Sequence, residues 1–359
     1  MSAQAAPQAL DPSKLQDFLG KAVNDMGAAI HSSLIVVGER LGLYKAMAGG
    51  NPMTAAELAQ KTGTHARYVQ EWLNANAASG YVTYHPEGRQ YSLNPEQIFT
   101  LANEDSPAYL PGFFIAASSV ARDLDKLENA FRTGKGVGWH EHHASLFEGT
   151  EKFFRPGYNA NLVASWIPSL EGVEAKLQRG ARVADVGCGH GASAIIMAKA
   201  YPKSTFFGFD YHPASIERAR KLAAQADVAD RITFEVAAAK SYPGKDYDLI
   251  AFFDCLHDMG DPVGAAKHVF QSLAADGTWM IVEPFAHDEV EKNLNPVGRI
   301  FYSASTMICT PASLAQEVGL GLGAQAGEAR LREVVTSGGF QHFRRANETP
   351  FNLIFEARK

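Results

Sequence analysis

The sequence predicts an α/β protein in which a mostly parallel sheet follows a smaller helical domain. From Leu177 onward, short apolar segments alternate with helical segments, and this alternation implies a parallel sheet with helices on both faces. The stretch 181–195 adds a glycine-rich loop between the earliest of these strands and its helix. We expect a domain at residues 1–100, a helical connector at 101–170 and the sheet domain at 171–359.

The composition of the chain excludes several classes of protein. A length of 359 residues suffices for two hydrophobic cores, and a formal charge of −6 argues against a nucleic-acid surface spread over the whole molecule. Three cysteines are too few for a disulfide framework or a zinc cluster. The N-terminus lacks a signal-peptide pattern, and the longest apolar stretch, Tyr109–Ala121, is too short to span a bilayer. We therefore expect a cytoplasmic protein with no membrane partner.

Apolar residues recur at steps of three and four between Leu15 and Ala48, which predicts one long helix. The residues of this stripe are Leu19, Val23, Met26, Ile30, Leu34 and Val37. Two interpretations fit the stripe equally well. It packs in the core of its own chain, or it forms a dimer interface.

A winged helix is predicted after this helix. Thr54 and Glu57 form a capping box, Gly63 makes a turn, and His65–Ala78 reads as a second helix, which is the spacing of a helix-turn-helix. Residues 83–93 follow as two short strands, the wing. Binding to DNA requires several Lys or Arg residues that neutralise phosphates. The second helix carries Glu71 beside Arg67, so we expect this unit not to bind DNA.

The connector contains two stretches with chemically useful side chains. Residues 139–147 carry His140, His142 and His143, and residues 153–168 carry Arg155 and Tyr158. Histidines without acidic or thiol partners at ligand spacing seldom bind a metal, so we favour the lining of a pocket over a metal site. A guanidinium or a phenol suits a carboxylate of a ligand, although packing beneath the connector explains Arg155 and Tyr158 as well.

The strands of the sheet domain are expected to end at one common mouth, because ligands of open α/β sheets bind beyond the carboxyl ends of the strands. The predicted strands are Arg182–Val186, Thr205–Asp210, Ile232–Val236, Asp248–Phe253, Thr278–Glu283 and a closing hairpin within Gly339–Lys359. The expected helices are Ala192–Ala200, Pro213–Ala226, Pro262–Leu273 and one near Gly327–Ser337.

The glycine-rich loop reads DVGCGHG from Asp185 to Gly191, and its glycines let the backbone turn sharply and approach a ligand. Asp210 ends the next strand about 20 residues further on, where an acid can bind ribose hydroxyls. These two features alone also suit a nicotinamide dinucleotide.

The string DVGCGHG resembles motif I of the class I S-adenosylmethionine (SAM) methyltransferases, and DLIAFFDCLHD (Asp248–Asp258) is similar to motif IV of small-molecule methyltransferases. Nicotinamide enzymes have no counterpart of the second motif. The whole chain resembles the bacterial winged-helix SAM-dependent methyltransferases that are sometimes labelled transcriptional regulators. This resemblance implies a Rossmann-like seven-stranded sheet, an N-terminal winged-helix dimerisation domain, a homodimer and a small-molecule acceptor.

The resemblance also implies roles for residues around the cofactor. Asp185 would face the ammonium group, the backbone of Gly187, Gly189 and Gly191 would cradle the cofactor, and Asp210 would bind the ribose. Tyr211 or His212 would lie against the adenine. Ala238 stands where such families often carry an acid, so recognition of the adenine would rest on backbone groups at Ala238 and Ala239 or on Ser241. The other cofactor contacts expected are Asp254 and Cys255.

His257 is the predicted general base, because LHDM resembles the LHDW string of O-methyltransferases and an ordinary imidazole pKa of about 6.5 suits proton transfer near neutrality. Asp258 would orient the imidazole, or it caps the following helix. Glu283 ends the strand at Thr278–Glu283 and His287 follows it. Both are expected near the acceptor, Glu283 more as a partner of a contacting residue than as a contact itself. Two alternatives remain open. One is a SAM-sensing DNA-binding regulator, and the other is a C-methyltransferase whose metal is held by His257, Asp258 and His287.

Overall fold

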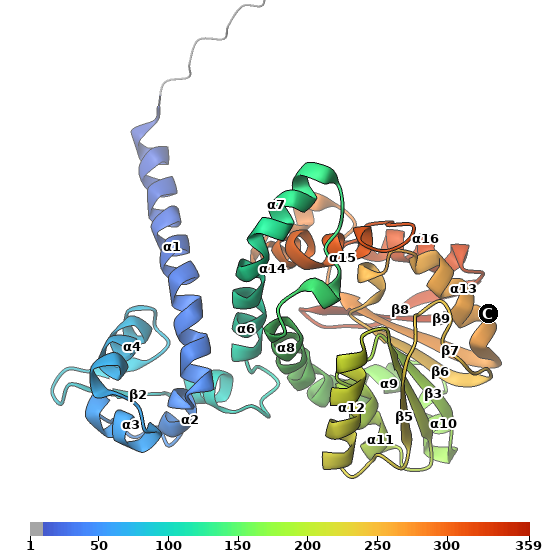
Figure 1. Ribbon diagram of the computed structural model, residues 1–359, viewed down its shortest axis with the longest axis horizontal. Coiled ribbons are helices and arrows are strands. Elements are labelled where there is room, and N and C mark those ends of the chain that lie inside the picture. Colours follow the sequence, from blue (N-terminus) through green and yellow to red (C-terminus); the bar gives the residue numbers. More distant parts are fainter. Residues whose placement is uncertain (1–9) are drawn as a thin grey trace, which may run out of the picture. The chain divides into compact units, whose positions relative to one another are not determined.

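The computed structural model describes residues 10–359, and the chain divides into two compact units after Phe114 (Figure 1). The connector predicted for 101–170 therefore contributes to both units. Within the described range, no helix combines the length and the apolar composition needed to cross a bilayer.

The N-terminal unit begins with the long helix α1 (Pro12–Arg40). The side chain of Asp11 caps this helix by accepting the N–H of Ser13 at 2.9 Å. Gly42 then adopts a left-handed backbone conformation with φ 66°, and α2 (Leu43–Met47) starts after it. The prediction of one unbroken helix over 15–48 is wrong at this glycine.

The apolar stripe of α1 lies mostly outside the core of its unit. Only His31, Ile35, Val36 and Gly38 of this helix are buried. By contrast, Val23 is 66% exposed and Ile30 is 74% exposed, and Leu19 and Met26 are exposed as well. Packing within its own unit therefore does not explain the stripe.

The predicted winged helix is confirmed. The helices α3 (Ala55–Thr62) and α4 (Ala66–Ala78) meet at Gly63, and β1 (Thr83–His85) pairs with β2 (Gln90–Ser92) as an antiparallel wing. The capping box is present, because Glu57 Oε2 accepts the N–H of Thr54 at 2.7 Å. The unit continues with α5 (Pro95–Gln97) and a π-helical turn at Ile98–Ala102.

The second unit contains the predicted seven-stranded sheet, in the order β5-β4-β3-β6-β7-β9-β8. The strands are β3 (Arg182–Val186), β4 (Thr205–Asp210), β5 (Ile232–Val236), β6 (Tyr247–Phe253), β7 (Leu273–Pro284), β8 (His342–Glu348) and β9 (Asn352–Arg358). β9 runs opposite to the six other strands of this sheet, so it pairs antiparallel with both β7 and β8. The expected closing hairpin is therefore confirmed.

Helices cover both faces of this sheet, as the alternation predicts. One face packs against α10 (Val173–Arg179), α11 (Ala192–Ala200) and α12 (Pro213–Gln225) in a core that contains Leu177, Met197 and Phe206. The other face packs against α13 (Pro262–Ser272) and α16 (Gly327–Ser337) around Trp279 and Phe252.

The remaining helices lie before β3 and between β7 and α16. The earlier group is α6 (Pro111–Val120), α7 (Leu124–Thr133), α8 (Ser145–Asn161) and α9 (Ile167–Ser169), with short 3₁₀ or π-helical turns at Ala121–Asp123, Trp139–Glu141 and Leu162–Trp166. The later group is α14 (Pro296–Ala304), a π-helical turn at Ser305–Cys309 and α15 (Thr310–Leu314). The sequence did not predict this later group.

Candidate active site

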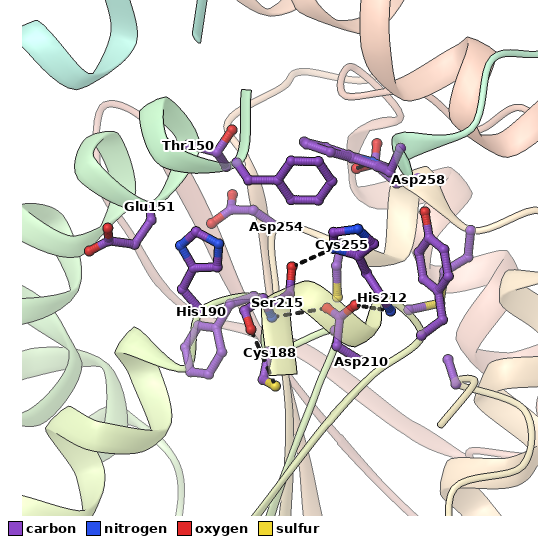
Figure 2. A pocket seen from close by; sticks show the side chains of 18 of the residues that line it. Thr150, Glu151, Cys188, His190, Asp210, His212, Ser215, Asp254, Cys255 and Asp258 are labelled. Carbon is purple, nitrogen blue, oxygen red and sulfur yellow. Dashed lines mark hydrogen bonds between the residues drawn. The ribbon is translucent and has the colours of Figure 1, made fainter. Parts of the chain in front are cut away.

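A cavity of about 450 Å³ opens at the carboxyl ends of β3, β4 and β6 (Figure 2). The chain leaves β3 toward β4 and β5 on one side and returns to β6 on the other, so the cavity lies at the switch point of the sheet. Its walls come from the loops that follow these strands, from the segment before α8 and from α8 itself. The loops after β3, β4, β5 and β6 share this mouth, as predicted, but no residue of the loop after β7 lines the cavity.

The glycine-rich loop forms the floor of the cavity. Gly187 has φ 74°, and a Cβ atom at this position would lie 2.8 Å from Cys255 Sγ, so glycine is required. Gly189 also lines the cavity and donates its N–H to Asp210 Oδ2 at 3.0 Å. Gly191 is not part of the lining. A Cβ atom there would meet the ring of Phe234 at 2.6 Å, so its role is close packing.

Asp185 does not line the cavity, which corrects the expectation that it faces a ligand directly. Its side chain turns toward the start of α11, where Oδ2 accepts the hydroxyl of Ser193 at 2.5 Å. The other oxygen, Oδ1, is buried without a hydrogen-bond partner. Burial raises the pKa of Asp185 to about 7, against the bonds from Ser193 and from the N–H of Ala194, which lower it.

Asp210 lies at the end of β4 and lines the cavity, as predicted. Its carboxylate accepts the N–H of Gly189 and, at 2.8 Å, the N–H of His212, and both bonds are drawn in Figure 2. Burial raises the pKa of this carboxyl group in spite of those two bonds. Beside it, the ring of His212 stacks on Phe147 with 4.5 Å between the ring centroids. Tyr211, Ala238 and Ala239 complete this part of the lining.

Asp254 and Cys255 line the cavity at the end of β6. The carboxyl group of Asp254 accepts the hydroxyl of Tyr158 at 2.8 Å and the side-chain amide of Asn352 at 3.0 Å. Asp254 has φ 49°, a left-handed conformation that aspartate tolerates better than most residues. Burial and the charge of Glu283 raise its pKa to about 8. At neutral pH, Asp254 is therefore mostly protonated.

The predicted base His257 lies behind the cavity wall. Asp258 lines the cavity and His257 does not, although the imidazole Nε2 is 3.2 Å from Asp258 Oδ1. On its other side, Nδ1 of His257 contacts Glu283 Oε2, and Glu283 Oε1 accepts the N–H of Leu256 at 3.0 Å. The structure thus corrects the expectation that the imidazole faces an acceptor, and it places Glu283 behind the imidazole as its partner. It places Asp258, His257 and Glu283 in a row that leads inward from the cavity.

The charges of Asp258 and Glu283 determine the protonation state of the His257 imidazole. Burial alone lowers the pKa of His257, but the carboxylates of Glu283 and Asp258 outweigh burial and raise it well above its ordinary value. The imidazole is therefore held as a cation between two carboxylates. The second oxygen of Asp258, Oδ2, accepts the indole N–H of Trp139 at 2.9 Å.

The other predicted acceptor contacts divide into two groups. His140 and Tyr158 line the cavity. His143 is exposed and contacts Arg122, with 2.6 Å between Nε2 and Nη1, and Arg155 pairs with Glu151 at 3.4 Å without lining the cavity. His287 is exposed as well. Our expectation for these last three residues is wrong, because loops and helix faces that the sequence does not orient carry them away.

Several lining residues were not predicted. His190 is one of them. Burial lowers its pKa to about 4, so its ring is neutral, and Nδ1 is buried without a partner. Met259 and Gln316 line the side near Asp258, and the Gln316 amide donates to the backbone oxygen of Asp258 at 2.9 Å. Gln316 follows α15 in a region without recognisable periodicity, so no signal in the sequence identifies it.

Two families of known proteins match this chain. Residues 177–332 match a family described as a methyltransferase domain, and residues 29–103 match one described as an Rv2258c-like winged HTH domain. The first match contains the glycine-rich loop, Asp210 and the row from Asp258 to Glu283.

Curated relatives match only part of the chain. A 27-O-demethylrifamycin SV methyltransferase from Amycolatopsis mediterranei is 28% identical over 207 residues, which are 54% of this chain and 63% of the relative. A norajmaline N-methyltransferase from Rauvolfia serpentina is 23% identical over 158 residues, which are 41% of this chain and 52% of the relative. The chain thus spans less than two thirds of either protein.

Solved structures match over nearly the full length. Human N-acetylserotonin methyltransferase in complex with SAM has a TM-score of 0.71 at 16% identity and covers 99% of both chains. An O-methyltransferase family protein from Burkholderia thailandensis has a TM-score of 0.70 at 16% identity, over 98% of this chain and 99% of its own. At these identities the likeness shows the fold alone.

Proposed function

We propose that this chain transfers the methyl group of SAM to a hydroxyl group of a small molecule. Residues 177–332 match the methyltransferase-domain family, and residues 29–103 match the winged HTH family. One observation carries the proposal. A single cavity joins a glycine-rich loop and Asp210 to the carboxylate of Asp258.

The residues present suit SAM. Asp210 has lone pairs free for ribose hydroxyls beyond its two backbone bonds, because a carboxylate accepts about four hydrogen bonds. The backbone of Gly187 and Gly189 approaches a ligand without a Cβ atom. The unpartnered Nδ1 of His190 suits a polar group of the ligand. We propose that Tyr211, which lines the cavity, lies against the adenine.

Methyl transfer is an in-line displacement for which SAM, when bound, supplies an activated methyl group and leaves as S-adenosylhomocysteine. The carbon–sulfur bond breaks as a carbon–oxygen bond forms, and the acceptor hydroxyl loses its proton. We propose that Asp258 accepts this proton, because Asp258 is the member of the row that lines the cavity. His257 and Glu283 act as positioning residues, since the imidazolium holds the carboxylate of Asp258 and Glu283 holds the imidazolium.

The aromatic wall indicates the shape of the acceptor. Trp139, Phe147 and Phe154 line the cavity with Met259, so a flat and mostly apolar molecule fits beside Asp258. The cavity must exclude water as well, because positioning and dehydration provide most of the catalysis in such a displacement.

Calorimetric titration of the full chain with SAM and with S-adenosylhomocysteine tests the cofactor assignment. We expect saturable binding of both molecules, and a nicotinamide dinucleotide serves as the negative control. Binding of the dinucleotide in place of SAM would overturn the proposal.

Binding of SAM is expected to release a proton near pH 7. Asp254 has a pKa of about 8, so it is protonated at pH 7, and a nearby cationic ligand lowers this pKa. Release should decline as the pH rises above 8, where Asp254 is already ionised. The measurement is calorimetry in buffers of different ionisation enthalpy. The D254N variant should bind SAM with less proton release, and equal release from both proteins would contradict the assignment.

We further propose a homodimer that forms through α1. Its support is the exposed stripe of Leu19, Val23, Met26 and Ile30, which is hydrophobic and continuous along one helix face. Replacing Val23 and Ile30 together with Glu is expected to convert the dimer to a monomer in light scattering after gel filtration. N24E introduces a single glutamate at an exposed position away from the stripe and should leave the dimer intact, and V23E alone is the matched single-charge variant. A monomeric wild-type protein would contradict this proposal.

The regulator alternative gains no support from the winged helix. Arg67 of α4 pairs with Glu71 at 2.5 Å, so its charge is already balanced within the helix. We propose that this unit does not bind DNA.

We also propose a cytoplasmic location, for which the three free cysteines are the support.

A further inference from the structure

Cys309 brings a thiol beside His257 and Asp258. It is the last residue of the π-helical turn Ser305–Cys309, between α14 and α15. Such turns insert one residue into a helix and are frequent at functional sites. The side chain of Cys309 is buried, and neither its sequence position nor its spacing relates it to His257.

The thiol lies beside two of the residues described above. His257, Asp258 and Cys309 each offer one atom, a ring nitrogen, a carboxylate oxygen and Sγ, and the three atoms lie within 4.8 Å of one another. All three residues are more than nine-tenths buried. Asp258 Oδ1 is the carboxylate oxygen that faces this group, because it lies 3.2 Å from His257 Nε2.

We propose that His257, Asp258 and Cys309 form a binding site for a thiophilic divalent cation such as Zn²⁺, and that the bound ion blocks methyl transfer. Thiolate, imidazole and carboxylate are the ligands that Zn²⁺ takes in proteins, at about 2.0–2.3 Å. A tetrahedral ion at these distances separates its ligands by roughly 3.5 Å, so small side-chain movements close the site. Three protein ligands leave a fourth position for water.

This site differs from the alternative that the sequence analysis left open. That alternative used His287, which is exposed, and the ligand group found among residues 10–359 contains Cys309 in its place. The inhibitory part of the proposal rests on the proposed function, because an ion on Asp258 occupies the carboxylate that is to accept the proton. The binding part stands independently of any activity.

Cobalt and zinc titrations of the full chain, without a histidine tag and after treatment with a chelator, test the binding. We expect one ion per chain and, with Co²⁺, the charge-transfer absorption that a thiolate ligand produces. C309S should lose this absorption. C309A should weaken Zn²⁺ binding by more than about 100-fold. Loss of a residue that only contacts a metal ligand costs about 10- to 100-fold, so the larger loss identifies Cys309 as a ligand. H287A is the matched control and should bind as the wild type does.

The outcomes distinguish the two proposals. SAM titration of C309S shows whether the variant is folded, because Cys309 does not line the cavity. A thiolate band that persists in C309S, or zinc binding that H287A loses, would overturn the site. Zinc binding that leaves methyl transfer unaffected would overturn the inhibitory role alone. Zinc binding in a chain that does not bind SAM would uphold the site and contradict the proposed function.

Discussion

Replacing Asp258 with Asn is expected to lower the rate of methyl transfer by about 10²- to 10⁴-fold, the usual contribution of a positioned acid or base. The physical reason is the place of Asp258 on the cavity wall, with the imidazole of His257 behind it. The amide keeps the shape of the side chain but cannot accept the proton of a hydroxyl group. SAM affinity should not change. The measurement is kcat with an acceptor chosen from a screen of small aromatic alcohols and phenols.

The variants H257N and E283Q separate a proton acceptor from the residues that position it. If His257 acts through Asp258, H257N should reduce kcat less than D258N does and should also alter the pH profile of kcat. E283Q should retain the most activity, because Glu283 is the member of the row that lies furthest from the cavity. Its amide keeps one acceptor oxygen for the two N–H donors of His257 and Leu256, so part of the positioning is lost. Full activity of D258N together with an inactive H257N would contradict this order and return the role of base to His257.

Replacing Asp210 with Ala is expected to weaken SAM binding by at least about 100-fold. Hydrogen bonds to a charged group contribute about 1.5–3 kcal/mol each, and a buried carboxylate at the end of β4 is placed to accept them from two ribose hydroxyls. The same change removes the bonds that hold the N–H groups of Gly189 and His212, so the loop is affected as well. The dissociation constant from calorimetry is the readout.

The matched control for D210A is E217A, which removes an exposed acid from the neighbouring helix α12 and should leave SAM binding unchanged. Thermal unfolding of both variants shows whether the fold is retained. Equal affinity of D210A and the wild type would contradict the assignment of Asp210 to the ribose.

Much of the fold could be predicted, because its signals are local. The alternation of apolar strands with amphipathic helices identified the sheet from β3 to β9, and the turn at Gly63 with a short wing identified the winged helix. The break at Gly42 was not predicted, since the apolar spacing continues across it. The helices α14 and α15 have no comparable signal, because the chain between β7 and α16 is irregular.

Much of the cofactor side of the site could be predicted from where strands end. Asp210 ends β4, Gly187 and Asp254 directly follow β3 and β6, and all three line the cavity. The sequence could not predict that Asp258 faces the cavity while His257 lies behind the wall, because this depends on how a 3₁₀ turn directs two adjacent side chains. Cys309 lies 52 residues beyond His257 in sequence, and only the packing of a π-helical turn brings the two together. The positions of Arg155 and His143 could not be predicted for the same reason. Neither side chain lines the cavity, and each contacts a charged neighbour, Glu151 and Arg122 respectively.

The most direct test of the central claim is the fate of a labelled methyl group. The full chain is incubated with methyl-labelled SAM and small-molecule extracts or pure aromatic alcohols, and D210A and D258N are treated in parallel. We predict label in the small-molecule fraction with the wild type and little or none with either variant. Label that appears only in nucleic acid or protein, or transfer to small molecules that D210A matches, would contradict the claim.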